Sequence, residues 1–307
     1  INKNDFNISV SEIKKAITRK TKVIIPVDIA GYPCDYNEIN NLVNSEDIKS
    51  KFKAETEEQR KLNRILILSD AAHSLGGKYY NNKVGNLTDI TVYSFHAVKN
   101  LTTAEGGAIC LNLRSEFDNT QVYNTLNIKS LHGQNKDALA KSQIGNWEYD
   151  IIEPGYKCNM TDIQAAMGIV EIQRYDNDIL VKRKKIFDLY SKLLSKYDWA
   201  IIPEYESEVK TSSYHVYLLR IDGISEFQRN EIIKEIYQRQ VAVNVHFKPL
   251  PLMSYYKSIG YNIDNFPNSY NNYIKEISLP VYYNLTEENV ETVVNAVVNA
   301  VKKVLKC

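Results

Sequence analysis

The sequence predicts an α/β fold in which a mainly parallel, doubly wound sheet is followed by a smaller C-terminal α+β domain. Short apolar runs alternate with helical segments in the N-terminal part of the 307-residue chain. This alternation is typical of parallel strands joined by helices. The C-terminal part instead predicts two short strands and two helices, the last with valines at helical spacing over residues 286–305.

The N-terminal part is predicted to begin with a helix over residues 10–19, because residues 9–12 match a capping box and apolar residues recur on one face. A helical core is predicted at 39–43, and the charged run at 46–63 indicates a solvated helix or excursion. Strands are predicted at residues 23–28, 65–69, 91–94 and 108–111.

A second capping box at 161–164 opens a helix whose small residues Ala165, Ala166 and Gly168 would permit close packing against another helix or subunit. A long amphipathic helix is predicted at 179–197. Beyond it, the pattern predicts strands at 215–221 and 241–246 and helices at 226–239 and 286–305. We therefore divide the chain into a large domain (1–178), a connecting helix (179–199) and a small domain (200–307).

Charge and composition exclude several classes of function. Basic and acidic residues are nearly balanced, 38 against 37, so no excess field indicates a nucleic acid or an anionic membrane as partner. No apolar run is long enough to cross a bilayer, and no signal-peptide core is present at the start. The cysteines, Cys34, Cys110, Cys158 and Cys307, show no metal-ligand or disulfide spacing. These observations predict a cytoplasmic protein with free thiols.

Asp70 and Lys99 suggest a ligand site at the edge of the predicted sheet. Asp70 ends one apolar run, and Lys99 follows the next run after Ser94. Because ligands bind at the carboxyl ends of strands in open α/β sheets, the two side chains can meet there. Pyridoxal phosphate needs an anion beside its ring nitrogen and an amine for its aldehyde. Taken alone, Lys99 also fits a solvated surface charge and Asp70 a helix cap.

Three ordered motifs resemble the pyridoxal-phosphate sugar aminotransferases of the DegT/StrS type, which have the fold-type-I transferase architecture. The first is residues 69–76 (SDAAHSLG), the second is 94–100 (SFHAVKN) with 103–107 (TAEGG), and the third is 155–164 (GYKCNMTDIQ). The resemblance covers nearly the whole chain, including residues 245–249 (VHFKP) and 278–280 (SLP).

The resemblance implies roles for residues of the central stretch. Lys99 would hold pyridoxal 5′-phosphate as a Schiff base and move the proton during catalysis, and Asp70 would pair with the pyridine nitrogen. Ala72 would lie against the ring, His73 near its phenolic oxygen, and Ser94 near the phosphate. His73 also fits an ordinary polar residue of a turn, and Ser94 a strand-end cap.

Further residues are implied outside this stretch. Lys157 would reach the cofactor phosphate of the neighbouring subunit in a homodimer, and a lysine can bind phosphate as a point charge. His246 and Asn159 are candidates for lining the substrate pocket, although each fits a structural role equally well. His96, His132 and His215 show no metal-ligand spacing, so no metal is assigned.

The implied reaction is the transfer of an amino group from glutamate to a nucleotide-linked keto sugar, nearest to a 4-keto sugar on UDP, in surface-polysaccharide or glycan precursor biosynthesis. A branch of the family replaces the Schiff-base lysine with histidine and catalyses dehydration, whereas this chain keeps Lys99. No membrane or nucleic-acid partner is implied.

The pattern departs from the family at the N-terminal side. Relatives carry a preceding segment with a phosphate-binding loop at a helix N-terminus and an aromatic residue that stacks on the ring. No Gly-Thr-Ala-type loop precedes Asp70, so we expect that half of the cofactor site to lie outside this sequence. The alternative hypothesis is a truncated, catalytically impaired member that retains only the fold or a partner-binding role.

Overall fold

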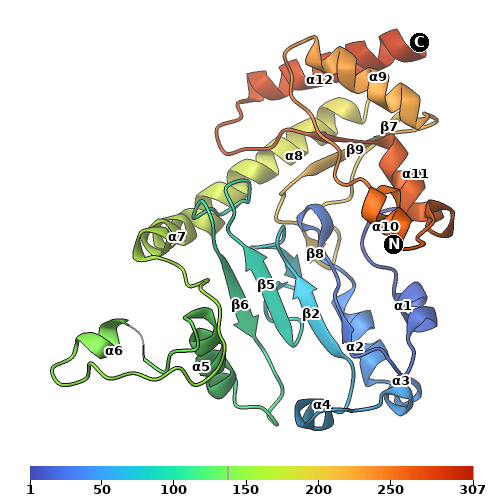
Figure 1. Cartoon of the computed structure of the whole chain (residues 1–307). Coiled ribbons are helices and arrows are strands. Elements are labelled where there is room, and N and C mark those ends of the chain that lie inside the picture. The colour runs from blue at the N-terminus through green and yellow to red at the C-terminus, as the bar shows by residue number, and fades with distance from the viewer. Residues whose placement is uncertain (137, 307) are drawn as a thin grey trace.

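The central sheet of the molecule is mainly parallel, as the sequence predicts. The computed structural model describes residues 1–136 and 138–306 (Figure 1). The sheet has the order β1 (Val23–Ile24), β2 (Leu66–Asp70), β5 (Ile90–Ser94) and β6 (Gly107–Leu111). The first three strands run parallel, and β6 pairs antiparallel with β5. The carboxyl ends of the three neighbouring parallel strands therefore lie at the same edge of the sheet.

The first strand is shorter than the predicted 23–28. Pro26 has no amide to donate to a ladder, and beyond it only Val27 pairs with Asp70, as an isolated bridge. A 3-10 turn, Ile29–Gly31, then takes the chain away from the sheet.

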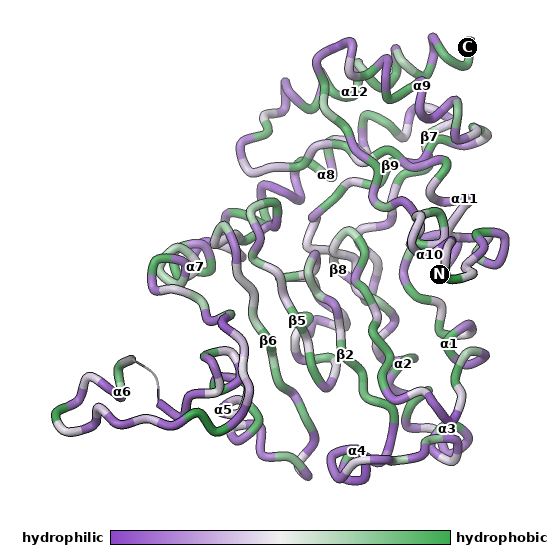
Figure 2. Tube along the Cα trace, in the orientation of Figure 1, coloured by the Kyte–Doolittle hydropathy of each residue, from purple (hydrophilic) through white to green (hydrophobic). Residues whose placement is uncertain are grey.

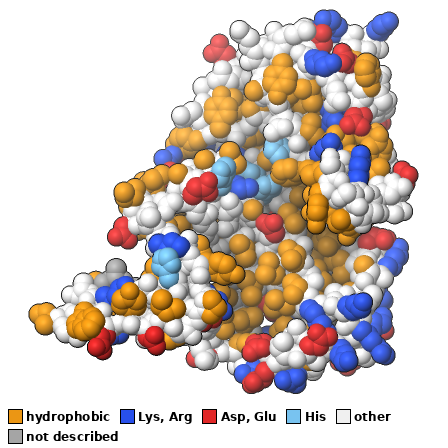
Figure 3. Space-filling model, viewed as in Figure 1, with side chains coloured by type: hydrophobic (Ala, Val, Ile, Leu, Met, Phe, Trp, Pro, Cys, Tyr) orange, Lys and Arg blue, Asp and Glu red, His pale blue; other side chains and the backbone are white. Residues whose placement is uncertain are grey.

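Helices cover one face of this sheet. They are α1 (Val10–Ala16), α2 (Tyr36–Asn44) and α3 (Glu46–Lys51), whereas α4 (Glu57–Leu62) lies at the lower end of the sheet in Figure 1. Ile13, Ile39 and Ile48 pack with Ile67 of β2 in one buried cluster. The charged run at 46–63 forms α3 and α4, which are mostly exposed, as predicted. On the opposite side, apolar side chains cover the front of β2, β5 and β6 in Figure 3, and Figure 2 shows the hydrophobic character of these strands.

The capping-box prediction for α1 is wrong, although the helix itself is confirmed. The hydroxyl of Ser9 pairs with that of Ser11 at 3.0 Å and makes no capping bond, and the Glu12 carboxylate pairs with Lys15. The second predicted box is confirmed, because Thr161 and Gln164 bond reciprocally at the start of α7 (Asp162–Arg174).

The segment between β6 and α7 extends away from the sheet (Figure 1). It contains α5 (Asn119–Ser130) and α6 (Ala138–Ser142). The sequence analysis missed α5 because its apolar residues do not gather on one face; Asp118 caps it by accepting from the amides of Thr120 and Gln121. Neither α5 nor α7 has a fully buried residue.

The C-terminal part has its own core. A π-helical turn, Tyr175–Ile179, joins α7 to the amphipathic helix α8 (Leu180–Leu194), which begins one residue later than predicted. Two further helices, α9 (Glu226–Tyr237) and α12 (Glu287–Leu305), cover an antiparallel sheet of β7 (Ala200–Ile201), β9 (Tyr217–Ile221) and β10 (Glu276–Leu279). The buried cluster includes Phe187, Leu219, Ile232 and Val297. The exact domain boundaries stay a prediction.

The predicted strand at 241–246 is wrong. Only Asn244 pairs with Ser278 of β10. The neighbouring amides bond to side chains instead: Val245 donates to Asn244 Oδ1 at 2.8 Å and His246 to Glu276 Oε2 at 2.9 Å. A continuous ladder is therefore impossible. The following loop contains α10 (Ser254–Ser258) and α11 (Pro267–Lys275), and a small sheet unites β3 (Lys78–Tyr79), β4 (Asn82–Lys83) and β8 (Lys210–Thr211).

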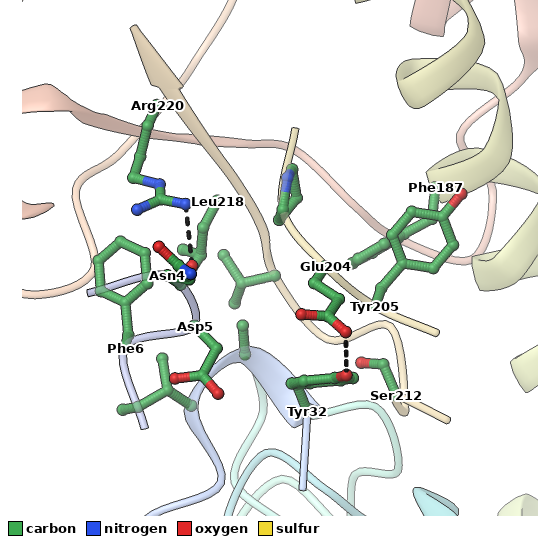
Figure 4. Close-up of a pocket in the computed structure, with 14 residues that line it drawn as sticks. Asn4, Asp5, Phe6, Tyr32, Phe187, Glu204, Tyr205, Ser212, Leu218 and Arg220 are labelled. Atoms are coloured by element: carbon green, nitrogen blue, oxygen red, sulfur yellow. Dashed lines mark hydrogen bonds between the residues drawn. The ribbon is translucent and has the colours of Figure 1, made fainter. Parts of the chain in front are cut away.

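Polar contacts join the two cores. Figure 4 shows the Arg220 guanidinium of β9 beside Asn4 and the Tyr32 hydroxyl beside Glu204. Arg220 donates to the carbonyls of Lys3 and Asn4, and Tyr32 donates to Glu204 at 2.8 Å. Among the described residues, no helix combines the length and apolar composition needed to cross a membrane.

Asp28 is a fully buried carboxylate at the start of the 3-10 turn. It accepts hydrogen bonds from the Cys34 amide (2.8 Å), the Tyr36 hydroxyl (2.7 Å) and the Ser74 hydroxyl (2.6 Å). Its own amide donates to the Asp70 carbonyl at 3.2 Å. One side chain thus fixes the start of α2 to the turn that follows β2.

Asp28→Ala should lower the free energy of unfolding by about 3–5 kcal/mol, because three buried donors lose their acceptor. Urea denaturation followed by circular dichroism measures this change. The control is Asp47→Ala, which removes an exposed ion pair with Lys51 and should cost less than about 0.5 kcal/mol. Equal effects of the two substitutions would contradict the role given to Asp28.

Candidate active site

The site lies at the carboxyl ends of strands β2 and β5. Asp70 is the last residue of β2 and lies opposite Val92, and Ser94 ends β5 opposite Gly107 of the antiparallel β6. The loop at 95–106 leaves and returns at this edge and carries Lys99. The structure thus brings Asp70 and Lys99 close enough for their charges to interact.

The Lys99 loop is held by its own backbone and by apolar contacts. The Phe95 amide donates to the Gly106 carbonyl at 2.8 Å, and the Thr103 amide donates to the Phe95 carbonyl at 2.9 Å. Leu101 is buried against Tyr175 of the π-helical turn. These contacts hold the backbone of the loop, and so the position of Lys99, in place.

Partial burial gives Lys99 the properties of a nucleophile. Desolvation lowers the pKa of its amine, and the nearby Asp70 carboxylate opposes that shift. A lower pKa increases the fraction of neutral amine that can attack a carbonyl carbon. Asp70 in turn accepts from the Ala72 amide at 3.1 Å, which orients one of its carboxylate oxygens.

His73 lies in the turn after β2, against two other rings. Its ring centroid is 4.4 Å from that of His215 and 6.0 Å from that of Phe247, with the last pair stacked. Burial, helped by the charge of Lys99, lowers the pKa of His73 to about 3, so its ring is neutral at physiological pH. Its Nδ1 is buried and has no hydrogen-bond partner among the described residues. This orphaned atom indicates a missing partner.

Asn100 fixes the ring of His215. The Asn100 amide nitrogen donates to the Ser213 carbonyl at 2.7 Å, so its oxygen accepts from Nδ1 of His215, also at 2.7 Å. The Arg183 guanidinium of α8 donates to the His215 carbonyl at 2.7 Å. Burial lowers the pKa of His215 as well. The sequence analysis missed Asn100, His215 and Phe247 as site residues; the available signals were that Asn100 directly follows Lys99 and Phe247 directly follows His246.

A close backbone approach at Gly31 holds His73 in place. The Ser213 hydroxyl donates to the His73 carbonyl. A Cβ atom at Gly31 would stand 2.1 Å from that hydroxyl oxygen, and its φ of +92° also favours glycine. A side chain at position 31 would therefore displace the turn that carries His73.

His246 faces the same opening from the C-terminal part. Burial and the charge of Lys99 lower its pKa. It lines a cavity of about 390 Å³ together with Val98, His215 and Ser278. Figure 3 shows histidine side chains gathered with a basic side chain around a hollow near the centre of this face.

Lys157 and Asn159 do not join this group within one chain. Both are exposed and lie on the segment that runs beside α5, where the Cys158 amide donates to the Ser130 carbonyl. Their side-chain bonds go to each other and to Met160. Ser94 stands at the strand end and accepts a 3.4 Å bond from the His96 amide. The roles predicted for Ser94, Lys157 and Asn159 stay predictions.

The donor set fits pyridoxal phosphate better than a metal ion. Among residues 1–136 and 138–306, no three His, Cys, Asp or Glu side chains gather as metal ligands. By contrast, Lys99 offers a desolvated amine, Asp70 a carboxylate for a ring nitrogen, and His73 an unsatisfied Nδ1. An aldehyde, a protonated ring nitrogen and a phenolic oxygen are the groups that these residues would meet.

Several proteins resemble this chain over nearly all of its length. The chain is 30% identical to the spore coat polysaccharide biosynthesis protein SpsC of Bacillus subtilis, over 98% of this chain and 72% of SpsC. It is 28% identical to a UDP-4-amino-4,6-dideoxy-N-acetyl-β-L-altrosamine transaminase of Campylobacter jejuni, over 99% of this chain and 73% of that protein.

Solved structures of sugar aminotransferases also resemble this chain over nearly all of its length. Spr1654 of Streptococcus pneumoniae, a protein assigned as a sugar aminotransferase, superposes in its PMP form with a TM-score of 0.93 at 42% identity, covering 99% of this chain and 75% of that one. Its PLP form gives a TM-score of 0.92. The sequence profile of the DegT/DnrJ/EryC1/StrS aminotransferase family matches residues 1–50 and 55–298. The chain belongs to the DegT/DnrJ/EryC1/StrS aminotransferase family.

Proposed function

We propose that this protein uses pyridoxal 5′-phosphate to transfer an amino group from glutamate to the keto carbon of a nucleotide-linked sugar. The observation that carries the proposal is the meeting of the desolvated Lys99 amine, the Asp70 carboxylate and the unpartnered His73 Nδ1 at one sheet edge. The transaminase and polysaccharide names of the relatives support a UDP-linked 4-keto sugar destined for a surface glycan.

Each residue of the edge has a separate task. Bound pyridoxal phosphate would supply an electron sink for negative charge at the reacting carbon. Lys99 would attach the aldehyde and carry the proton between substrate and cofactor carbons. Asp70 would stabilise positive charge on the ring nitrogen, and Ala72 would lie against the ring. His73, being neutral, would bond the phenolic oxygen without adding a charge, and Ser94 would bind the phosphate.

We further propose a homodimer in which Lys157 serves the site of the partner. Exposed apolar side chains on α7 and on the extended segment before it indicate a surface that another chain covers; they are Ile144, Trp147, Ile163, Ile169, Val170 and Ile172. Lys157 is exposed on that same segment, and its side chain bonds to Asn159. His246 and Asn159 remain the candidates for contacts with the sugar.

Lys99→Ala should abolish both covalent cofactor attachment and turnover, because it removes the partly buried amine that the fold brings beside Asp70. Borohydride reduction of the wild-type protein incubated with pyridoxal phosphate, followed by peptide mass analysis, should place the added mass on Lys99. Lys196→Ala, an exposed lysine after α8, is the control and should retain attachment. Mass on another lysine, or none on the wild type, would refute the proposal.

Asp70→Ala should keep covalent attachment of the cofactor at Lys99 and yet slow turnover by about 10²–10³-fold. The reason is that the positive charge on the ring nitrogen of the cofactor loses its anionic partner. The measurement is 2-oxoglutarate formation from glutamate in the presence of a UDP-linked 4-keto sugar. Normal turnover by this variant would show that Asp70 does not contact the cofactor ring.

At a limiting concentration of pyridoxal phosphate, neither the Lys99→Ala protein nor the Lys157→Ala protein should be active alone. A mixture of the two proteins should recover activity. In a mixed dimer, one of the two sites combines an intact Lys99 with an intact Lys157 from the other chain. Native mass spectrometry verifies that mixed dimers form. Mixed dimers without recovered activity would contradict the role of Lys157 across the interface.

A further inference from the structure

A buried carboxylate lies behind His246 and is connected to its imidazole. Glu276 begins β10 and is fully buried. Its Oε2 accepts from the His246 amide at 2.9 Å, and its Oε1 is 2.5 Å from the Ser278 hydroxyl. That hydroxyl is also 2.7 Å from Nδ1 of His246. The three side chains form a continuous hydrogen-bonded path from the protein interior to an imidazole ring.

The other end of the imidazole faces the opening beside Lys99. His246 lines the cavity shared with Val98 and His215. The charge of Lys99 acts on its ring. Within the described part of the chain, the structure gives Nε2 of His246 no hydrogen-bond partner, in contrast to Nδ1. Nε2 is therefore the atom that an incoming ligand would meet.

We propose that Glu276 and Ser278 form a proton relay that sets the tautomer of His246, and so decides whether Nε2 donates or accepts a hydrogen bond in the opening beside Lys99. The physical basis is that the Ser278 hydroxyl has one hydrogen and stands between two groups. When this hydrogen points to Glu276, Nδ1 of His246 must donate. When it points to His246, Nδ1 must accept.

Protons balance along this path. With Glu276 ionised, Ser278 donates to the carboxylate, Nδ1 carries the imidazole hydrogen, and Nε2 presents a lone pair. When Nε2 takes up a proton from the opening, Nδ1 passes its hydrogen to Ser278 and Ser278 passes its own to Glu276. The result is a neutral carboxylic acid and a neutral imidazole with hydrogen on Nε2, so one proton has entered and the ring carries no net charge.

The surroundings favour this neutral pair over an ion pair. Burial raises the pKa of Glu276 to about 8, although the Ser278 hydroxyl, the His246 amide and Arg229 oppose the shift. Burial and Lys99 lower the pKa of His246. The charged or titratable groups that face the path are Arg229 of α9, Arg220 opposite Glu276 on β9, and Lys99, His73 and His215 around the ring.

The relay would give the site a neutral donor at physiological pH. Below pH 8, Nε2 would carry hydrogen and could bind an oxyanion, such as a carboxylate or phosphate oxygen of a ligand. A cationic imidazole at the same place would instead lower the pKa of the Lys99 amine further by repulsion. Glu276 and Ser278 are thus positioning residues that act through His246.

The test does not depend on the proposed reaction, because it reads the imidazole directly. The protein has five histidines, so ¹⁵N-histidine labelling and long-range ¹H–¹⁵N spectra resolve each ring, and His246→Gln assigns the signal of residue 246. Between pH 6 and 10, hydrogen on the His246 ring should move from Nε2 to Nδ1 with a midpoint near pH 8. A ring with the same tautomer throughout this range would overturn the proposal.

Two variants separate the relay from a merely structural role. In Glu276→Gln, the side-chain oxygen should accept from the His246 amide while the NH₂ group donates to Ser278, which holds hydrogen on Nε2 at every pH. Ser278→Ala should also remove the step near pH 8. Glu287→Gln, an exposed position of α12, is the control and should keep it. A step that persists in Glu276→Gln would refute the relay.

Discussion

The candidate site depends on the buried carboxylate of Asp28. Its oxygens collect the Cys34 amide and the Tyr36 and Ser74 hydroxyls, and its own amide meets the Asp70 carbonyl. Burial raises the pKa of Asp28, while these hydrogen bonds favour the charged form. The Asp28 carboxylate joins the start of α2 to the turn after β2. The same residue therefore anchors both α2 and the end of the strand that carries Asp70.

Burial, more than ion pairing, sets the chemistry of the opening. Desolvation is the largest cause of the lowered pKa values of Lys99, His73, His215 and His246. Three neutral imidazoles therefore surround one amine, and Asp70 is the carboxylate whose charge acts on that amine. Such a site can hold an anionic cofactor or ligand without a fixed excess of positive charge.

The sequence predicted those parts of the fold and of the site that depend on neighbouring residues in the chain. Asp70 and Lys99 could be placed together because each follows a recognisable strand, and the Thr161 capping box marked the start of α7. The contacts of His215 and Phe247 with His73 could not be predicted, since these side chains reach His73 only through folding of distant segments. The strand predicted at 241–246 failed because side chains of Asn244 and Glu276 take the amides that a ladder would need, and periodicity carries no sign of that competition.

The π-helical turn at Tyr175–Ile179 has a mechanical consequence. It inserts an extra residue between two successive helices. Of these, α7 has no buried residue, whereas α8 buries Arg183, Phe187 and Tyr190. The Gln164 side chain of α7 donates to the Glu105 carbonyl in the Lys99 loop at 2.8 Å, and α8 packs in the C-terminal core. The two helices therefore connect the C-terminal core directly to the loop that carries the reactive amine.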